Sequence, residues 1–354
     1  MSSESSQEAT QPLEESANKA ENPPSLNVWG WLVNMKSSEK HCLFPITGVS
    51  YSVGRDSSCH LVIHPNTFRN CQGENLKYAK LSRVQFELIR DGNNKISLMD
   101  KSMNGTFINE YFVGKSKKSC IRNGDVISIV QENFEVFHFF EERSIQSSYP
   151  CEIYSKYLVG RRLGEGTTAV VREGFIRSSQ EMVAMKFITK DRWEGEYGEP
   201  EDLMQEVNIL RDLDHPCVTK VLDCVETSEI FLIVMEFVGG GELEQQVNED
   251  HEEENFNEDK VKFQFYQLCH TIKYLHSRNV CHRDLKLENI LLSDQGPDSL
   301  IKVSDFGLSK VWRAGESLKT FAGTPVYMAP EILILMEGLQ TRSYTCKSDC
   351  WSLG

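Results

Sequence analysis

The distribution of apolar and polar positions divides the chain into several parts. Between about residues 27 and 141, short apolar or alternating runs are separated by Gly, Asn and Asp, as in residues 91–94 and 122–125. Short strands at regular spacing, with turn residues between them, predict an all-β sandwich. The expected strands are Trp29–Val33, Tyr51–Val53, Leu61–Ile63, Val84–Ile89, Lys95–Met99, Thr106–Ile108, Val126–Val130 and Phe134–Phe140.

A second region, over 157–354, begins with strands and then becomes helical. Apolar residues at helical spacing predict one helix over 203–213 and another over 261–275, with a buried strand over 231–235 between them. Residues 1–26 hold too few apolar side chains for a core and are predicted to be disordered. Residues 142–156 are predicted to be a linker, and the acidic run over 248–259 a solvated loop or helix face.

Composition narrows the class of protein. The chain has 354 residues, 40% hydrophobic and 25% charged, which is typical of a soluble globular protein with two or three domains. The net charge of -14 argues against a nucleic-acid partner. No apolar stretch approaches the roughly 20 residues that cross a membrane, and the polar, acidic N-terminus is neither a signal nor a transit peptide. The 11 cysteines form no C-x-x-C pair, so we expect reduced thiols in an intracellular protein and no metal site.

Motifs near residue 164 indicate a phosphate-binding site. Gly164 and Gly166 let backbone amides close over phosphate groups, with Ala169 where a third glycine is usual. Lys186 follows in a strand-like setting and can pair with the α- and β-phosphates of ATP, and Glu206 in the first helix can form the ion pair that holds it. Taken singly, each is more often an ordinary loop, strand or helix residue.

The segment over 282–289 carries the strongest signal. It matches H-R-D-L-x-x-x-N, the catalytic loop of protein kinases. Asp284 is the expected base for the substrate hydroxyl, Lys286 steadies the transferred phosphate, and Asn289 is a Mg²⁺ ligand. Asp305 is the first residue of a D-F-G sequence and the expected main Mg²⁺ ligand. Residues 329–331 have the sequence A-P-E. Six elements in this order exclude a chance match.

This ordered set resembles the protein kinase family, and Lys286 is similar to the lysine of its Ser/Thr members. The resemblance implies a two-lobed α+β fold over 157–354 with ATP and Mg²⁺ as cofactors. It places adenine between Val171, Ala184 and Leu292, and phosphorylation sites at Thr320 and Thr324, although a threonine at position 324 is more often structural. The ATP-binding residues it implies are Leu163, Gly164, Gly166, Ala169, Val171, Ala184, Lys186, Glu236, Val238, Glu242, Glu288, Asn289 and Asp305.

In the β-rich region, Arg55, Ser82, Arg83 and Asn104 stand in motifs that resemble the forkhead-associated (FHA) domain, a phosphothreonine-binding module. The two arginines and the serine hydroxyl supply bonds to phosphate oxygens, and Asn104 can bond the peptide backbone. Gln85 stands where that family usually has a histidine that supports the binding loop. The alternative for these residues is an ordinary sandwich with basic loops.

An FHA domain over 27–141 followed by a Ser/Thr kinase resembles the checkpoint kinase 2 family of the DNA-damage response. The resemblance implies a nuclear protein whose tail sites, Ser6 and Thr10, each followed by Gln, are phosphorylated by a PI3-kinase-like kinase. Phospho-Thr10 would bind the FHA domain of a second copy, and the resulting homodimer would phosphorylate Thr320 in trans. Glu242 and Glu288 resemble residues that select R-x-x-S/T substrates.

Two interpretations stay open. The chain is a Ser/Thr kinase, or it is an FHA adaptor with an inactive kinase-like domain, because the sequence stops within an expected C-lobe helix at 349–354 and leaves that lobe incomplete. A part of a longer kinase is favoured over a truncated isoform, since stopping within the helix would expose the C-lobe core. A purely structural scaffold is disfavoured by the intact Lys186, Asp284 and Asp305.

Overall fold

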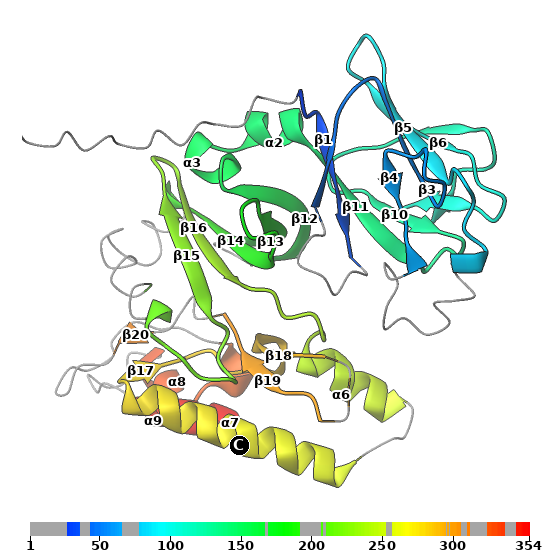
Figure 1. The fold of residues 1–354 in the computed structure, drawn as a ribbon. Helices are drawn as coiled ribbons and strands as arrows, with labels where there is room; N and C mark the ends of the chain where they lie inside the picture. The colour runs from blue at the N-terminus through cyan, green and yellow to red at the C-terminus, as the bar shows by residue number, and fades with distance from the viewer. Residues whose placement is uncertain are drawn as a thin grey trace, which may run out of the picture.

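The protein folds as a β-sandwich joined to a two-lobed domain (Figure 1). The structure, a computed structural model, describes residues 27–35, 43–65, 78–166, 169–191, 207, 210–252, 257–294, 296, 298–305, 310–311, 324–336 and 345–354. The predicted tail over 1–26 and most of the predicted helix over 203–213 lie outside these residues. Within them, no helix combines the length and apolar character needed to cross a membrane.

Two sheets form the sandwich, which confirms the predicted all-β region. Its strands are β1 (Gly30–Asn34), β2 (Leu43–Ile46), β3 (Ser50–Gly54), β4 (Leu61–Val62), β5 (Phe86–Arg90), β6 (Ile96–Asp100), β7 (Thr106–Ile108), β8 (Tyr111–Phe112), β9 (Lys118–Cys120), β10 (Val126–Ile129) and β11 (Glu135–Glu141). One sheet has the order β2-β1-β11-β10-β7-β8 and the other β4-β3-β5-β6-β9. Alternate residues of β6 are buried, so one row of its side chains enters the core between the sheets.

Three strands of the sandwich, β2, β8 and β9, were not predicted. Each lacks the apolar alternation that marks the others: Pro45 interrupts β2, both residues of β8 are exposed, and β9 holds no fully buried residue. These strands form through hydrogen bonding to neighbours whose own patterns are strong.

A five-stranded antiparallel sheet forms the upper lobe of the second domain. Its order is β12-β13-β14-β16-β15, and β16 contains the predicted buried strand over 231–235. Pairing of β13 with β14 places Val171 opposite Lys186, so the glycine-rich hairpin lies beside the lysine. The strands are β12 (Tyr157–Glu165), β13 (Ala169–Ile176), β14 (Met182–Thr189), β15 (Val221–Glu226) and β16 (Ile230–Glu236).

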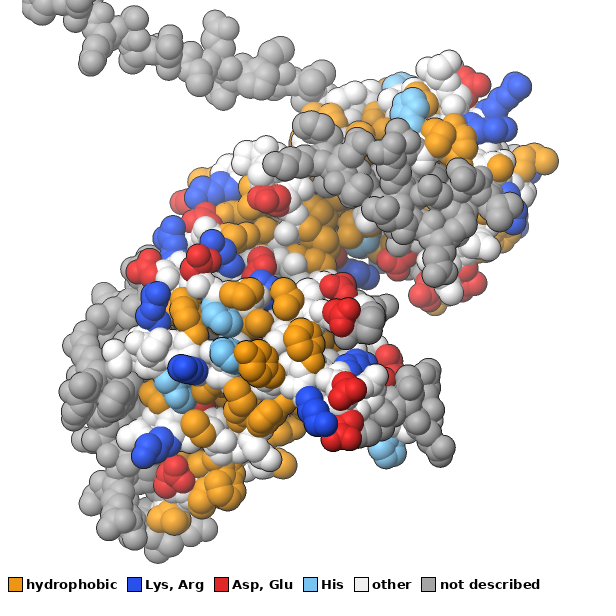
Figure 2. Space-filling model, turned by 60° about the horizontal axis from the view of Figure 1, so that its bottom comes forward, with side chains coloured by type: hydrophobic (Ala, Val, Ile, Leu, Met, Phe, Trp, Pro, Cys, Tyr) orange, Lys and Arg blue, Asp and Glu red, His pale blue; other side chains and the backbone are white. Residues whose placement is uncertain are grey.

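Helices dominate the lower lobe. The predicted helix over 261–275 is α7 (Glu258–Ser277), and Asn257 caps it by accepting a hydrogen bond from the Lys260 N–H. Of the five apolar residues that predicted α7, Leu268, Ile272 and Leu275 are buried, whereas Val261 and Phe265 are exposed. Figure 2 looks onto this side of the molecule, where hydrophobic side chains gather over the lower lobe. The other elements are α6 (Leu243–Glu252), α8 (Pro330–Met336), α9 (Lys347–Leu353), β17 (Val280–Cys281), β18 (Ile290–Leu292), β19 (Ile301–Val303) and β20 (Lys310–Val311).

The segment predicted to be a linker is helical instead. Residues 142–156 form α2 (Glu142–Ser148) and α3 (Cys151–Tyr154), which lie beside the upper lobe in Figure 1. Ile145 packs with residues of the sandwich and the upper lobe, and Ile153 packs with the upper lobe, so both are buried. Two isolated apolar residues give no periodic signal, and the contacts that hold these helices come from distant strands.

Two of the cysteines that we expected to be reduced are joined. Cys281 in β17 and Cys346, directly before α9, form a disulfide with their Cα atoms 5.0 Å apart. The bridge lies in a small apolar cluster with Met328, Ala329 and Ile332. The prediction was wrong for this pair because the two residues are separated by 65 positions and only the fold brings them together.

Candidate functional site

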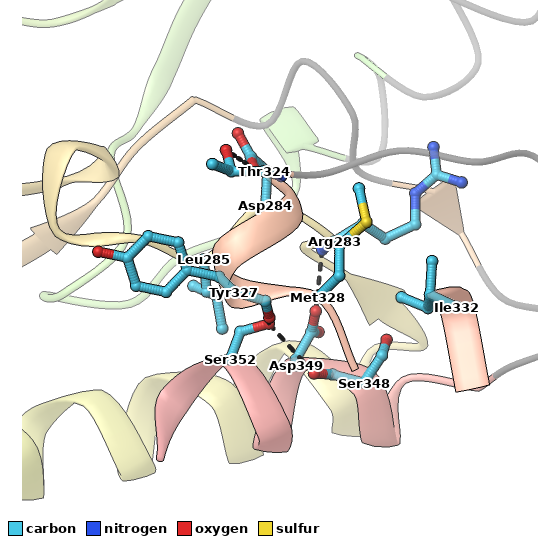
Figure 3. A pocket seen from close by; sticks show the side chains of 10 residues that line it. All are labelled: Arg283, Asp284, Leu285, Thr324, Tyr327, Met328, Ile332, Ser348, Asp349 and Ser352. Carbon is cyan, nitrogen blue, oxygen red and sulfur yellow. Dashed lines mark hydrogen bonds between the residues drawn. The ribbon is translucent and has the colours of Figure 1, made fainter. Parts of the chain in front are cut away.

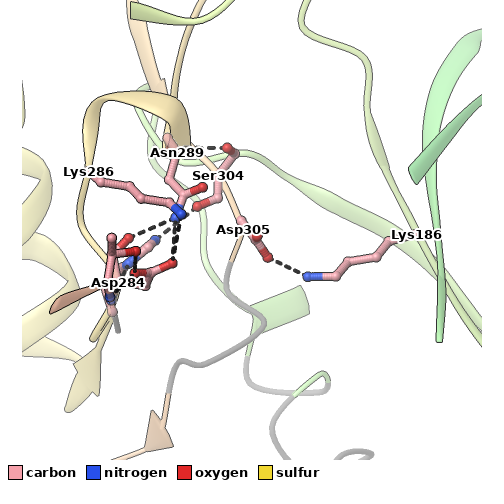
Figure 4. A network of polar contacts seen from close by, with 8 residues as sticks. Lys186, Asp284, Lys286, Asn289, Ser304 and Asp305 are labelled. Atoms are coloured by element: carbon pink, nitrogen blue, oxygen red, sulfur yellow. Dashed lines mark hydrogen bonds and ion pairs between the residues drawn. The ribbon is translucent and has the colours of Figure 1, made fainter. Parts of the chain in front are cut away.

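Polar side chains converge on Asp284, in the loop between β17 and β18 (Figure 4). Thr324 donates hydrogen bonds to Asp284 Oδ1 from its backbone N–H at 2.9 Å and from its hydroxyl at 2.8 Å. Asn289 Nδ2 donates to Asp284 Oδ2 at 3.1 Å and to the Asp284 carbonyl at 2.8 Å. Lys286 Nζ lies 3.6 Å from Oδ2. The structure therefore brings together the predicted base, the predicted phosphate-binding lysine and one predicted metal ligand.

Asp349 on α9 holds the catalytic loop from below, as Figure 3 shows for Arg283. Its carboxylate accepts hydrogen bonds from the backbone N–H of His282 at 3.0 Å and of Arg283 at 2.8 Å, and it contacts His276 Nε2 at 2.8 Å. Arg283 has a φ of 70°, a left-handed conformation that persists only when neighbouring groups support it. Asp349 is 1% exposed and was missed by sequence analysis, because its partners lie 66 and 67 positions away in the chain.

Lys186 reaches from β14 across to the lower lobe. Its side chain is largely buried, and its Nζ contacts Asp305 Oδ1. The left-handed φ of 55° at Asp305 turns the chain directly after Ser304, whose N–H is bonded to the Asn289 carbonyl. The predicted partner Glu206 lies outside the described residues, so the contact on this lysine in the structure is the one to Asp305.

The glycine-rich hairpin leaves open space beside Gly164. Gly164 pairs with Val171 across β12 and β13, and the Gly166 N–H donates to the Ala169 carbonyl at 2.8 Å. A Cβ atom on Gly164 would meet nothing within 4 Å. Leu163, which precedes it, is exposed, whereas Ala169 is buried and belongs to the apolar core.

One residue that was predicted to line the adenine slot lies elsewhere in the structure. Leu292 is 1% exposed and packs in the core of the lower lobe, so it does not line the slot. Leu291 lies on the other face of β18 and is half-buried, like Val171 and Ala184. Successive side chains of a strand point to opposite faces. This alternation over Ile290–Leu292 was the signal that distinguishes Leu291 from Leu292.

The end of β16 leads from the predicted adenine slot toward α6. The Glu236 carboxylate accepts hydrogen bonds from Lys302 Nζ and from the Lys220 N–H, both at 2.8 Å. Val238 follows in the segment that joins β16 to α6. This strand end therefore lies at the junction of the two lobes.

Two acidic side chains lie near the catalytic loop. Glu242 stands just before α6 and forms a backbone bridge with Leu291. Burial and the charges of Glu244 and Glu288 raise the pKa of Glu242, and the Lys286 charge opposes them. Glu288 Oε2 is buried and has no hydrogen-bond partner among the described residues. A clustered negative charge with an unused acceptor suits a cationic side chain.

The sandwich carries a separate cavity of about 400 Å³ at one end, and all four predicted phosphopeptide residues line it. Arg55 and Arg83 are exposed, and Ser82 Oγ accepts a hydrogen bond from the Met103 N–H at 2.9 Å. A Cβ at Gly54 would lie 2.1 Å from the Arg83 carbonyl, so only glycine lets these two arginine-bearing segments approach. Lys80 and Lys101 also line the cavity and were missed.

Gln85 supports the loops of this cavity. Its side chain is 0% exposed, and its Oε1 accepts a hydrogen bond from the Ser82 N–H at 3.2 Å. Its Nε2 donates to the Gly105 carbonyl at 2.8 Å and to Thr106 Oγ1 at 3.1 Å. Gln85 therefore ties the two loops that carry Ser82 and Asn104, the support that the FHA resemblance assigns to a histidine.

The candidate phosphorylation sites fall into two groups. Thr324 is described, and both its hydroxyl and its N–H are bonded to Asp284, which is the structural role considered for it. Thr320, Thr10 and Ser6 lie outside the described residues.

Comparison with known proteins matches both regions to families. The protein kinase domain family matches residues 157–354, and the FHA domain family matches residues 51–130. The ovarian-specific serine/threonine-protein kinase Lok of Drosophila melanogaster is 36% identical over 285 residues, which is 78% of this chain and 58% of Lok. The serine/threonine-protein kinase chk-2 of Caenorhabditis elegans is 35% identical over 78% of this chain and 58% of its own length. The kinase cds1 of Schizosaccharomyces pombe is 32% identical over 85% and 65%.

These relatives are longer than the matched region. The chain spans between about half and two thirds of the length of the first curated relatives that it matches.

Proposed function

Since this chain belongs to the checkpoint kinase 2 family of FHA-containing Ser/Thr protein kinases, we propose that it transfers the γ-phosphoryl group of ATP to Ser and Thr hydroxyls of proteins. The observation that carries the proposal is the convergence of Thr324, Asn289 and Lys286 on Asp284. Thr324 occupies Oδ1 with two hydrogen bonds, so the carboxylate is held in one orientation. A carboxylate fixed in this way can accept the proton of an attacking hydroxyl.

Other residues bind the nucleotide in this proposal. The backbone of Gly164 and Gly166 covers the phosphates, Lys186 neutralises phosphate charge, and adenine lies between Val171, Ala184 and Leu291. The hinge residues Glu236 and Val238 offer backbone groups to the adenine edge.

The donor set fits Mg²⁺. Asn289 Nδ2 is committed to Asp284, which leaves the amide oxygen as the ligand atom, and Asp305 supplies carboxylate oxygens. Oxygen ligands of this kind are those that Mg²⁺ prefers. When bound, the ion neutralises charge on the phosphate oxygens. Lys286 lies where it can steady the transferred phosphoryl group beside Asp284.

Phosphotransfer from ATP to an R-x-x-S peptide tests this function. Asp284→Asn keeps the shape of the side chain but removes the proton acceptor, so we expect kcat to fall by about 10²-fold or more. Asp298→Asn, at an exposed position, serves as the matched control and should keep full activity. An Asp284→Asn protein as active as the control would refute the proposal. A wild-type chain that binds phosphothreonine peptides but transfers no phosphate would support the adaptor function instead.

The sandwich is proposed to bind phosphothreonine peptides at the cavity of Arg55, Ser82, Arg83 and Asn104. The arginines carry the charge that pairs with phosphate, and Lys80 and Lys101 add to it. Glu242 and Glu288 are proposed to select substrates with an arginine three residues before the target hydroxyl.

Activation is proposed to proceed through pairing of two copies in the nucleus. A PI3-kinase-like kinase phosphorylates Thr10 and Ser6, phospho-Thr10 binds the FHA cavity of a second copy, and Thr320 is phosphorylated in trans at high effective concentration. Thr10→Ala should abolish dimerisation of the phosphorylated chain in analytical ultracentrifugation, whereas Ser6→Ala should leave it largely intact because FHA domains select threonine. A dimer that persists in Thr10→Ala would exclude this route.

A further inference from the structure

We propose that the FHA sandwich completes the nucleotide-binding lobe, with His138 acting as a positioning residue for the glycine-rich hairpin of β12 and β13. His138 lies on β11 of the sandwich, and Glu173 lies on β13 of the upper lobe. His138 Nδ1 is 2.8 Å from Glu173 Oε1, and both side chains are 0% exposed. A fully enclosed polar pair therefore joins the two domains.

The charge of Glu173 explains why the pair matters. A buried carboxylate is strongly unfavourable unless it is paired and hydrogen-bonded. Among the described residues, the hydrogen-bond donors to the Glu173 side chain are His138 and Arg161, whose Nε donates to Oε2 at 3.1 Å. Arg161 is half-exposed, so His138 is the enclosed partner. Because a carboxylate only accepts, His138 Nδ1 carries the hydrogen, and His138 Nε2 is left buried without a partner.

Apolar side chains from both domains enclose this pair. The ring of Phe140 on β11 meets the ring of Phe175 on β13 edge to face, with centroids 5.6 Å apart. The two rings belong to one cluster that also holds Val33, Leu43, Ile145 and Leu158. Water is excluded from such a cluster, so the polar contact inside it is strengthened and the loss of either partner becomes more costly.

The pair lies at an irregularity of the glycine-rich hairpin. The register of β12 and β13 shifts between Val159 and Arg162, and this shift leaves Gly160 and Arg161 as a bulge. A Cβ at Gly160 would lie 2.7 Å from Glu173 Cγ and 3.0 Å from Phe140 Cε1, so only glycine fits there. Bulges redirect side chains and set the local twist of a strand. This one directs Arg161 to Glu173, and the hairpin continues from it to the phosphate-binding glycines.

A second contact from the sandwich reaches the same strand. Asn123, in the turn before β10, donates from Nδ2 to the Val159 carbonyl at 3.4 Å. Its Oδ1 accepts a hydrogen bond from the Glu141 N–H at 3.0 Å, which fixes the side chain. Both strands at the base of the hairpin thus contact the sandwich, and we infer that the twist of the hairpin depends on the sandwich being docked.

The test uses the full chain and two readouts that do not require phosphoryl transfer, so it stands apart from the test of kinase activity. These are amide hydrogen exchange over residues 157–176 and the dissociation constant for ATP with Mg²⁺. The variants are His138→Val, Glu173→Leu and the double variant, and His251→Val at an exposed histidine of α6 is the matched control. Phosphothreonine-peptide affinity reports on folding of the sandwich.

His138→Val should raise exchange over 157–176 by about tenfold and weaken ATP binding several-fold, while phosphopeptide affinity stays unchanged. The double variant should return both readouts toward wild type, because two apolar side chains replace the pair without leaving a buried charge. If His138→Val gives no folded protein, Glu173→Leu alone is compared with the double variant, which should be the better protected. Wild-type exchange and ATP affinity in His138→Val, or a double variant no better than the singles, would overturn the proposal.

Discussion

Gln85 shows how a different side chain can hold the same loops. Its amide offers one acceptor and two donors, and the structure uses all of them on Ser82, Gly105 and Thr106. The departure from the usual FHA histidine was visible in the sequence. Its consequence was not, because two of the three partners, Gly105 and Thr106, lie about twenty residues away in the chain. The same three groups define the first prediction.

Gln85→Ala should remove three hydrogen bonds and leave the Ser82 N–H without its partner. We expect a loss of about 1–3 kcal/mol in the free energy of unfolding of the sandwich and a clearly weaker phosphothreonine-peptide affinity, because the loops of Ser82 and Asn104 are no longer tied. Gln85→His should retain most of both properties. Chemical denaturation and calorimetric titration measure the two effects, with Gln131→Ala at an exposed turn as the control. Equal stability of Gln85→Ala and the control would contradict this role.

If Glu242 selects substrates as proposed, that selection should depend on pH. Because its pKa is raised above that of an ordinary glutamate, it takes up a proton earlier as the pH falls, and its attraction for an arginine of the substrate is then lost. We expect the ratio of kcat/KM for an R-x-x-S peptide to that for an A-x-x-S peptide to fall as the pH is lowered from neutral into the acidic range, and to begin falling at a higher pH than an ordinary glutamate would give. In Glu242→Gln the ratio should be smaller and flatter across this range. A ratio that does not change with pH in the wild type would argue against Glu242.

At the scale of single elements, α9 acts on the catalytic loop through one side chain. Asp349 binds two successive N–H groups of the loop, and one of them belongs to Arg283 in its left-handed conformation. The Cys281–Cys346 disulfide joins the residues that directly precede the loop and the helix. The helix and the loop therefore form one unit.

Asp349→Asn should disturb this unit without touching the nucleotide site. An amide presents a donor toward one of the two N–H groups, so we expect kcat to fall by about tenfold or more and KM for ATP to change little. Cys350→Ser on the exposed side of the same helix is the control. Steady-state kinetics at saturating and limiting ATP separate the two parameters. An unchanged kcat would show that the loop keeps its conformation without this carboxylate.

At the scale of the whole molecule, the sequence predicted well the features that depend on residues close together in the chain. The sandwich, the strand within β16 and the helix α7 follow from residue periodicity, and Asp284, Lys286 and Asn289 follow from a motif of eight residues whose members the structure brings together. Features that join distant segments were not predictable in this way. Asp349, the disulfide and the helices over 142–156 depend on partners that only the assembled fold supplies.

The division into domains was also only partly predictable from the sequence pattern. The change of pattern after residue 141 predicted a linker over 142–156 between the two domains. The buried cluster that contains Phe140, Ile145 and Phe175 crosses that boundary. A boundary in sequence pattern is therefore not a boundary in packing here.

The enclosed pair of His138 and Glu173 also constrains how related sequences can diverge. A substitution at either position alone leaves a buried polar atom of the other residue without its partner, whereas simultaneous apolar substitutions do not. Lineages that keep this docking should therefore change the two positions together, although they lie in different domains. A recombination event that joined this sandwich to the kinase domain of a relative with an apolar residue at position 173 would inherit an unmatched histidine, so the two domains are expected to be inherited as one.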